Sequence, residues 1–287
     1  MVEITVLSGK GGTGKTSITA ALAAVAENAV LCDNDVDAAD LHLILTPKII
    51  HSDQFAAGWQ ASINYEECIQ CGRCQELCRF GAVHQTNNGY EINPFQCEGC
   101  RLCERECPVQ AITSKQSTNN SWYISNTRFG KMVHAKMGPG EENSGKLVSL
   151  VRSESKKIAQ KEKLNYIIND GPPGIGCTAI SSLTGTDKVL IVIEPTISGW
   201  HDAKRLIQLI RKFGVRCYAV INKSDLNLEF TEQVTNNLKE EQVPLLGEIT
   251  FDERFVEAAI RNETIIEYAP NSENAQKIKE IWTQLNN

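Results

Sequence analysis

The sequence lacks the long hydrophobic runs that membrane-spanning helices need. Its longest uninterrupted apolar run covers residues 20–26, whereas a transmembrane helix takes about 20 consecutive apolar residues. The first residues lack the basic segment of a secretory signal, so we expect a cytoplasmic protein. An excess of positive charge is absent as well, since the formal net charge is −6. These absences argue against a membrane or a nucleic acid as the main partner.

Cysteine, in contrast, is abundant and unevenly distributed. The chain of 287 residues holds eleven cysteines, and eight of them lie between positions 68 and 107. Disulfide frameworks are rare in the cytoplasm, so this concentration favours metal binding. The five histidines show no metal-binding spacing, and we assign them no role.

The segments on either side of the cysteines alternate short apolar runs with stretches of helical spacing. The apolar runs, rich in Val, Ile and Leu, cover residues 3–7, 29–32, 166–169, 188–194 and 216–221. Helical spacing marks residues 203–213 and 275–285, and we expect the last of these helices to pack on the sheet. This alternation predicts an α/β fold, in which a doubly wound, mainly parallel sheet carries helices on both faces.

An internal repeat interrupts this pattern. Cysteines spaced C-x₂-C-x₂-C-x₃-C occur once between positions 68 and 78 and again between positions 97 and 107. We therefore expect a first α/β segment at residues 1–63, an inserted cysteine module at residues 64–115, and a second α/β segment at residues 116–287. The Gly-rich, polar stretch at residues 138–145 predicts a mobile loop.

A phosphate-binding loop follows the first predicted strand. The segment GKGGTGKT, residues 9–16, fits the pattern G-x-x-x-x-G-K-[ST] between a strand and a helix. Its glycines let backbone N–H groups turn toward phosphate oxygens, and the helix N-terminus adds a favourable dipole. We expect Lys15 to neutralise the β- and γ-phosphates and Thr16 to bind Mg²⁺. The predicted nucleotide-binding residues of this loop are Gly9, Gly11, Gly12, Thr13, Gly14, Lys15, Thr16 and Ser17.

The spacing of each cysteine run is that of the bacterial two-cluster ferredoxins, where the fourth cysteine of one run ligates the other cluster. We expect two [4Fe–4S] clusters. The first would be held by Cys68, Cys71, Cys74 and Cys107, and the second by Cys97, Cys100, Cys103 and Cys78. Zinc is the alternative, because C-x₂-C pairs also bind it, but zinc leaves the spacing of the third and fourth cysteines unexplained.

The two copies differ after their last cysteine. The second copy continues into Pro108, as ferredoxins usually do, whereas the first has Arg79. Arginines at positions 73, 79, 101 and 105 lie among the ligands. They either offset the negative charge of the clusters through hydrogen bonds near the ligands or are simply solvated.

Lys10 makes the phosphate-binding loop a variant form. The motif KGGTGKT resembles the deviant Walker A motif of the MinD/ParA/Mrp superfamily of ATPases, which includes iron–sulfur carriers and the nitrogenase iron protein. This resemblance implies that Lys10 reaches the phosphates of a partner subunit across a nucleotide-sandwich dimer. The partner would be a second copy or a paralogue.

The same resemblance assigns roles to three aspartates. Asp35, which follows the second predicted strand, would orient the attacking water, and Asp33 would support the Mg²⁺ shell. Asp170, after the strand at residues 166–169, would hold a Mg²⁺-bound water. Lys10, Lys15, Asp35 and Asp170 are thus the implied catalytic residues, with Thr16 and Asp33 at the Mg²⁺ ion. Alternatively, the acidic loop caps the next helix through Asp37 or Asp40.

Residues 222–225, Asn-Lys-Ser-Asp, resemble a base-recognition motif of P-loop proteins. Asn222 would then hydrogen-bond the purine. Asp225 raises the possibility of guanine, although related ATPases also carry this asparagine, so we favour ATP with low-level use of GTP. A plain turn at the end of a strand is the alternative.

The resemblance covers nearly the whole chain and implies a P-loop ATPase with an inserted two-[4Fe–4S] ferredoxin domain. The expected function is ATP hydrolysis coupled to electron transfer with a redox partner. A cluster assembly or carrier ATPase is one alternative, but the C-terminal C-x-x-C pair of such carriers is missing. A positioning ATPase like MinD or ParA is another.

The three remaining cysteines lie outside the repeat. Cys32 and Cys217 fall in predicted strands and are expected to be inert core residues. Cys177 either approaches a dimer mate or a partner's cluster, or is a small residue near a helix start.

Overall fold

The computed structural model describes residues 1–56, 58–138 and 144–286. The chain forms two compact units. The first comprises Met1–Ser52, Trp122–Lys136 and Ser144–Asn287, and the second comprises Asp53–Ser121 with the short segment that begins at Met137. The cysteine module that we predicted at residues 64–115 lies within the second unit, which extends beyond it on both sides.

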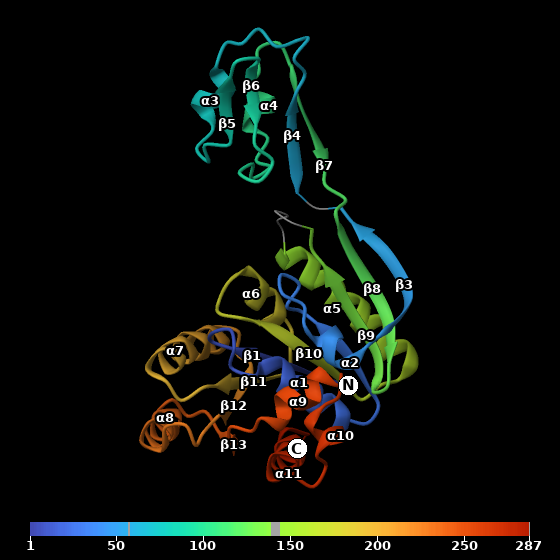
Figure 1. The fold of residues 1–287 in the computed structure, drawn as a ribbon, viewed down its shortest axis with the longest axis vertical. Coiled ribbons are helices and arrows are strands. Elements are labelled where there is room, and N and C mark those ends of the chain that lie inside the picture. The colour runs from blue at the N-terminus through green and yellow to red at the C-terminus, as the bar shows by residue number, and fades with distance from the viewer. Residues whose placement is uncertain (57, 139–143, 287) are drawn as a thin grey trace. The chain divides into compact units, whose positions relative to one another are not determined.

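A nine-stranded, mainly parallel sheet runs through the first unit (Figure 1). Its strands, in spatial order, are β13 (Leu245–Ile249), β12 (Arg216–Asn222), β11 (Lys188–Ile193), β1 (Val2–Ser8), β10 (Tyr166–Pro173), β2 (Ala29–Asp33), β9 (Gly130–Lys136), β8 (Asn120–Thr127) and β3 (Lys48–Phe55). The pairings from β13 to β9 are parallel. The apolar runs of the sequence form β1, β2, β10, β11 and β12, which confirms the predicted sheet.

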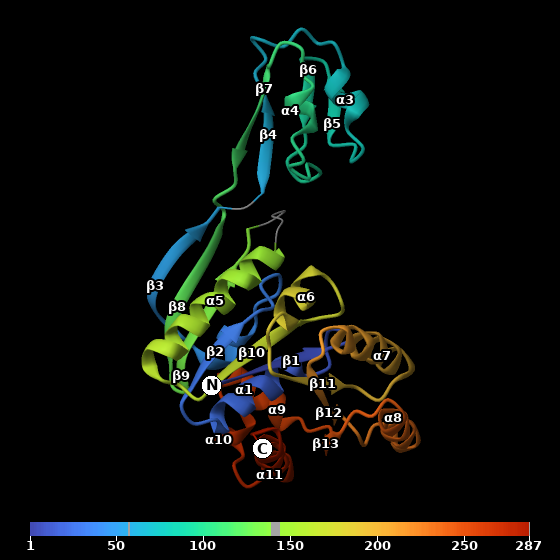
Figure 2. The same ribbon diagram turned by 180° about the vertical axis from the view of Figure 1, so that it is seen from behind.

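Helices cover both faces of this sheet (Figure 2). They are α1 (Lys15–Val25), α2 (Leu41–Leu45), α5 (Ser144–Glu162), α6 (Cys177–Leu183), α7 (Ile197–Lys212), α8 (Leu228–Glu240), α9 (Arg254–Ile260), α10 (Ile265–Tyr268) and α11 (Glu273–Asn286). Neighbouring residues of β1 point to opposite faces. Val6 packs in one core with Leu22 of α1 and Ile278 of α11, whereas Leu7 packs in the other with Leu206 of α7. The doubly wound architecture is thus confirmed, and the C-terminal helix packs as expected.

The second unit consists of two antiparallel strand pairs and two short helices. Strand β4 (Trp59–Ile63) pairs with β7 (Ile112–Gln116), β5 (Val83–Thr86) pairs with β6 (Gly89–Ile92), and the helices are α3 (Arg73–Leu77) and α4 (Leu102–Arg105). The buried apolar side chains described in this unit are Ala61, Ala82, Val83, Tyr90, Ala111 and Ile112. So small an apolar core rarely stabilises a domain of this size by itself.

Two further expectations concern the Gly-rich stretch at residues 138–145 and membrane-spanning helices. The loop expected at residues 138–145 falls mostly on residues 139–143, which lie outside the described residues, while Ser144 and Gly145 already belong to α5. Among the helices of the described chain, none combines the length and the apolar character that crossing a membrane requires.

Protonation of His134 on β9 affects the free energy of unfolding. It is buried, and its Nε2 lies 2.9 Å from Ser125 Oγ on β8. Burial, with a smaller contribution from the nearby His42, lowers the pKa of His134 to about 4. An unfolded histidine has a pKa of about 6.5, so the unfolded chain binds more protons between pH 4 and 6.5. The folded state therefore loses stability as the pH falls through this window.

The substitution His134→Gln should flatten this pH dependence. We expect the variant to lose less unfolding free energy than the unaltered protein between pH 7 and pH 4.5, by at most about 3 kcal/mol. Urea unfolding at several pH values measures the difference. His201→Gln is the matched control, because the side chain of His201 is 71% exposed. Parallel pH profiles for the unaltered protein and His134→Gln would contradict the prediction.

Candidate functional site

The predicted phosphate-binding loop lies between β1 and α1. Residues 9–14 connect the two elements, and Gly12 and Gly14 have φ values of +77° and +85°. These values fall in the left-handed region that favours glycine. At Gly14 a Cβ would also lie only 2.3 Å from Nδ2 of Asn222. The loop conformation therefore depends on glycine at this position.

The register of the sheet brings two of the predicted aspartates together. Strand β10 lies between β1 and β2, and Asp170 on β10 pairs with Asp33 on β2. Both side chains are buried. Because these strands are parallel, both carboxylates lie at the carboxyl edge of the sheet, where ligands of doubly wound folds bind.

Asp170 is the centre of a polar network beneath the loop. Its Oδ1 lies 2.9 Å from Lys15 Nζ and accepts a hydrogen bond of 2.8 Å from Thr19 Oγ1, while its Oδ2 accepts one of 2.8 Å from Thr16 Oγ1. Lys15 Nζ is also 3.7 Å from Asp35 Oδ2. Burial alone lowers the pKa of Lys15, but the neighbouring carboxylates, Asp170 first, raise it above its ordinary value. Lys15 is therefore a firmly charged ammonium group at the loop.

The second strand contributes two carboxyl groups with different surroundings. Burial, with the charge of Asp170, raises the pKa of Asp33 well above its ordinary value. Asp33 accepts backbone hydrogen bonds from Asp35, 3.1 Å, and Leu41, 3.3 Å, so it fixes the loop that carries Asp35. Burial raises the pKa of Asp35 to about 6. Asp40 stands at the N-cap of α2 but makes no side-chain cap hydrogen bond, while Asp33 accepts from the amide of Leu41, the first residue of the helix.

A cavity of about 290 Å³ opens above this network. It is lined by Ser8, Gly11, Gly12, Thr13, Gly14, Lys15, Thr16, Ser17, Asp35, Ala38, Asp40 and Pro173. Most of the loop residues predicted from the sequence thus share one cavity. Gly9 instead faces α7, where a Cβ would lie 2.6 Å from the backbone nitrogen of Ala203. Within the described residues, the buried Thr13 Oγ1 has no hydrogen-bond partner.

Lys10 does not line this cavity. Its Nζ lies 3.1 Å from Glu194 Oε2 and donates to Thr196 Oγ1 at 3.2 Å. Lys223 binds the other oxygen of Glu194 at 3.6 Å and donates to the Gly12 carbonyl at 3.1 Å. In this conformation the charge of Lys10 is neutralised within its own chain.

The two residues of the expected base-recognition motif are also engaged by the protein. Asn222 Nδ2 donates to the backbone oxygen of Thr13 at 2.7 Å, so this side chain supports the phosphate-binding loop. Asp225 Oδ1 accepts from the backbone N–H of Phe251 at 2.6 Å. Neither residue lines the 290 Å³ cavity.

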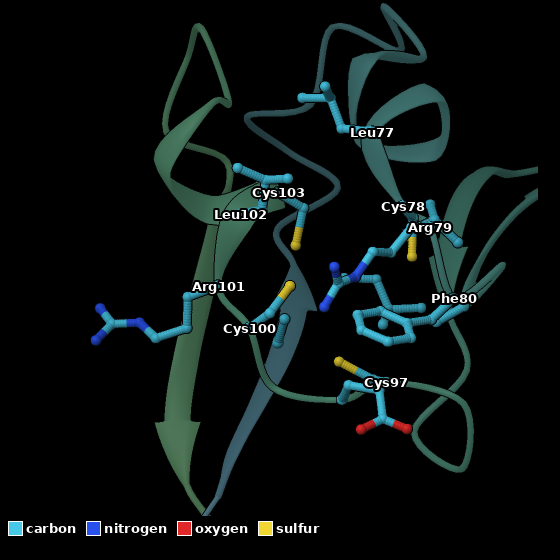
Figure 3. Close-up of a pocket in the computed structure, with 14 residues that line it drawn as sticks. Leu77, Cys78, Arg79, Phe80, Cys97, Cys100, Arg101, Leu102 and Cys103 are labelled. Atoms are coloured by element: carbon cyan, nitrogen blue, oxygen red, sulfur yellow. The ribbon is translucent and has the colours of Figure 1, made fainter.

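The eight clustered cysteines surround two cavities in the second unit. Cys78, from the first copy of the repeat, lines one cavity of about 180 Å³ with Cys97, Cys100 and Cys103 from the second copy. Figure 3 shows the four sulfur atoms directed into this space. The other cavity, of about 20 Å³, is lined by Cys68, Cys71 and Cys74 with Cys107. Each cavity thus takes its fourth cysteine from the other copy.

The chemistry of these thiols suits a metal-containing group. Burial raises the pKa of Cys103 to about 11 and also raises the pKa of Cys74. A cationic metal centre would stabilise the thiolate of Cys103 against this burial. Among the described residues, no three His, Cys, Asp or Glu side chains are arranged to hold a single metal ion.

The other three cysteines lie apart from the repeat. Cys32 is buried and Cys217 partly so, and burial raises the pKa of each thiol to about 12. Cys177 begins α6 and is exposed.

Two residues of the nucleotide site escaped the sequence reasoning. Thr19 supports Asp170 from the second turn of α1, and Glu194 follows β11 and binds Lys10. The sequence offered one signal for each residue. Thr19 places a hydroxyl group one helical turn after Lys15, and Glu194 is an acidic residue at the end of a predicted strand.

Comparison with known proteins agrees with this arrangement. An uncharacterised protein of Methanocaldococcus jannaschii is 32% identical over 236 residues, which are 79% of this chain and 80% of that protein. Ferredoxin-1 of Caulobacter vibrioides is 31% identical over 71 residues, 23% of this chain and 63% of that protein. The structure of the cell division ATPase MinD of Pyrococcus furiosus superposes with a TM-score of 0.58 at 19% identity and covers 99% of this chain and 98% of that one.

The fold and the loop define a nucleotide-binding protein of the MinD-like P-loop class with an inserted ferredoxin-like domain. The model of the CobQ/CobB/MinD/ParA nucleotide-binding domain matches residues 4–265. The chain therefore belongs to this family.

The geometry of the loop gives a test that needs no ligand. Gly14→Ala should destabilise the nucleotide-binding unit by about 1–3 kcal/mol, because alanine at this φ is strained and its Cβ collides with Asn222. Gly11→Ala is the matched control, since a Cβ there meets nothing within 4 Å. Urea unfolding without nucleotide measures both. Equal stabilities for the two variants would show that the loop conformation is not constrained at Gly14.

Proposed function

We propose that this protein binds and hydrolyses ATP and couples the resulting conformational change to electron transfer with a redox partner. The observation that carries the proposal is the presence, in one chain, of a phosphate-binding loop and of two cavities that share their cysteines between the copies of a repeat. Two [4Fe–4S] clusters, ATP and Mg²⁺ are the proposed cofactors.

The cysteine cavities support the iron–sulfur part of the proposal. The first cluster would be held by Cys68, Cys71, Cys74 and Cys107, and the second by Cys97, Cys100, Cys103 and Cys78. A [4Fe–4S] cluster, when bound, takes up and releases one electron at a time. The exchange of the fourth cysteine also ties α3 to α4, which pack together. Because each cluster would have four cysteine ligands, we favour stably bound clusters over a labile cluster that is delivered to another protein.

The polar network beneath the loop supports nucleotide hydrolysis. Lys15 and Thr16 line the cavity, where the ammonium group would neutralise the β- and γ-phosphates and the hydroxyl would bind Mg²⁺. Asp170 holds both side chains in place and would orient a water on the Mg²⁺ ion, and Asp33 would support that shell. Asp35 also lines the cavity, in a position to orient the attacking water.

The purine that Asn222 would meet is proposed to be adenine. One N–H of its amide is committed to the Thr13 carbonyl, and the amide oxygen stays available. That oxygen would accept from the 6-amino group of adenine. Asp225, which guanine recognition would require, is anchored through one oxygen to the amide of Phe251.

The position of Lys10 fits a role across a dimer interface. Its ammonium group is held by Glu194 and Thr196 and does not line the cavity of its own chain. Reaching the phosphates of a partner would require the Lys10–Glu194 ion pair to open. The proposed assembly is therefore a nucleotide-dependent dimer with a second copy or a paralogue.

Chain connectivity supports coupling between the nucleotide site and the cysteine unit. Asp33 anchors Leu41 at the start of α2, and α2 leads directly into β3 and the second unit. The returning chain enters β8 and then β9, which pairs with β2 at Leu31 and Cys32, immediately before Asp33. Movement of the loop that carries Asp35 would therefore be felt at α2 and at β9, which lie next to segments that join the two units.

The iron content of cysteine variants tests the cluster assignment. Protein purified without oxygen should hold about eight iron atoms per chain, and Cys78→Ser should hold about half as many, because one ligand of the second cluster is lost. Cys177→Ser, which removes an exposed thiol outside the repeat, should keep the full amount. Iron and acid-labile sulfide are measured together. Zinc in place of iron, or equal iron in all three proteins, would refute the assignment.

Coupling is tested by EPR spectroscopy of the reduced protein. MgATP should change the iron–sulfur signals, and MgGTP should change them less. Lys15→Gln should abolish the response, because it removes the charge that would bind the phosphates together with the ion pair to Asp170. Identical spectra with and without MgATP would contradict coupling. Ready transfer of the iron to an acceptor apoprotein would favour the carrier alternative.

A further inference from the structure

The two copies of the cysteine repeat fold alike. Asn64 and Asn93 occupy matching positions, and their backbone amides donate to Ala111 at 2.7 Å and to Ala82 at 2.8 Å. The matching residues Gln70 and Gly99 have φ values of +55° and +61°. Gly81 and Gln110, also at matching positions, have φ values of +63° and +55°. The backbone therefore has a similar conformation around the two cavities.

The copies differ in charge at the residue that follows the last cysteine. Arg79 follows Cys78 and lines the larger cavity, whereas Pro108 follows Cys107 and lines the smaller one. Figure 3 shows the guanidinium group of Arg79 directed among the sulfur atoms, while the side chain of Arg101 points away from them. One cavity thus contains a cationic group that has no counterpart at the matching position of the other.

The other arginines near the cysteines are neutralised or lie elsewhere. Arg73 pairs with Glu106 at 2.6 Å, and Arg101 pairs with Glu104 at 2.7 Å. Arg79 forms no ion pair with any described residue, and its Cζ lies 4.8 Å from the centre of the Phe80 ring. 

Acidic groups near the larger cavity do not cancel this charge. Glu98 also lines the cavity, but among the described residues it forms no ion pair with Arg79, and both side chains are exposed, so water screens both charges. The position of Arg79 decides, because Figure 3 shows its guanidinium group among the sulfur atoms. Arg73 does line the smaller cavity, but its charge is already compensated by Glu106. The unpaired positive charge therefore acts mainly on the larger cavity.

We propose that Arg79 makes the two iron–sulfur sites unequal, so that the site of Cys78, Cys97, Cys100 and Cys103 has the higher reduction potential. The inference rests on the proposed function, because it requires both clusters. Uptake of one electron, supplied by a reduced one-electron donor that is itself oxidised, adds one negative charge and breaks no bond. A guanidinium group at the cavity wall stabilises that added charge. An electron that enters the cysteine unit therefore comes to rest at the site that contains Arg79.

Redox titration of the full chain, followed by EPR spectroscopy, tests the inference. The unaltered protein should show two midpoint potentials. Arg79→Gln should lower the higher one toward the lower one, which should stay in place, and Arg79→Lys should keep most of the separation because it keeps the charge. Pro108→Arg should raise the lower potential, because it places a guanidinium group at the matching position. Arg105→Gln is the control, since Arg105 is exposed and lines neither cavity.

Iron and sulfide contents, measured on each protein before titration, separate the possible failures. Unaltered protein without iron would refute the proposed function. Full iron with a single midpoint potential, or with potentials that Arg79→Gln leaves in place, would refute the inference alone. A shift of the same size in Arg105→Gln would also refute it, since any lost surface charge would then suffice. Should Arg79→Gln lose its iron, Arg79→Lys and Pro108→Arg decide the question in the same way.

Discussion

The carboxylate of Asp170 holds the phosphate-binding loop to the central sheet. It accepts from Thr16 and Thr19 and pairs with Lys15, so the first turns of α1 are fixed at the end of β10. A buried carboxylate without such partners would be strongly destabilising. Three donors from one helix satisfy it, and they also place the ammonium and hydroxyl groups at the cavity. The geometry of the nucleotide site thus depends on one charge that the fold has to neutralise.

The order of the strands places Asp170 next to several parts of the nucleotide site. Because β10 lies between β1 and β2, Asp170 is next to both the loop after β1 and the acidic segment after β2. Strand β2 in turn pairs with β9, which follows β8, the strand through which the chain returns from the cysteine unit. The nucleotide site and the connections to the inserted unit therefore share neighbouring strands.

The parts that the sequence predicted well were those encoded by local pattern. The five strands at the centre of the sheet are largely buried on both faces, and their short runs rich in Val, Ile and Leu reveal them. The phosphate-binding loop and the cysteine repeat were visible because their chemistry fixes the spacing of a few residues. In both cases a short segment carries the whole signal.

The rest depended on contacts between distant segments. Strand β3 is exposed along almost its whole length, and residues such as His51, Ser52 and Gln54 hide its strand character. The support that Asn222 gives to Thr13 spans 209 residues, and the Lys10–Thr196 hydrogen bond spans 186. Likewise, the repeat marked Arg79 as the counterpart of Pro108, but it did not show that this side chain, of the four arginines near the cysteines, is directed among the sulfur atoms. Only the packing of the chain determines which of these groups meet.

The scarcity of buried apolar side chains in the cysteine unit has a biological consequence. The nucleotide-binding unit has extensive cores on both faces of its sheet, whereas the cysteine unit buries few side chains larger than alanine. Small metal-binding domains gain much of their folding energy from the metal that they bind. Under the proposed function, a cell starved of iron would therefore make a chain in which the nucleotide-binding unit is folded and the cysteine unit is unfolded. Nutrient supply would then set how much working protein a cell contains.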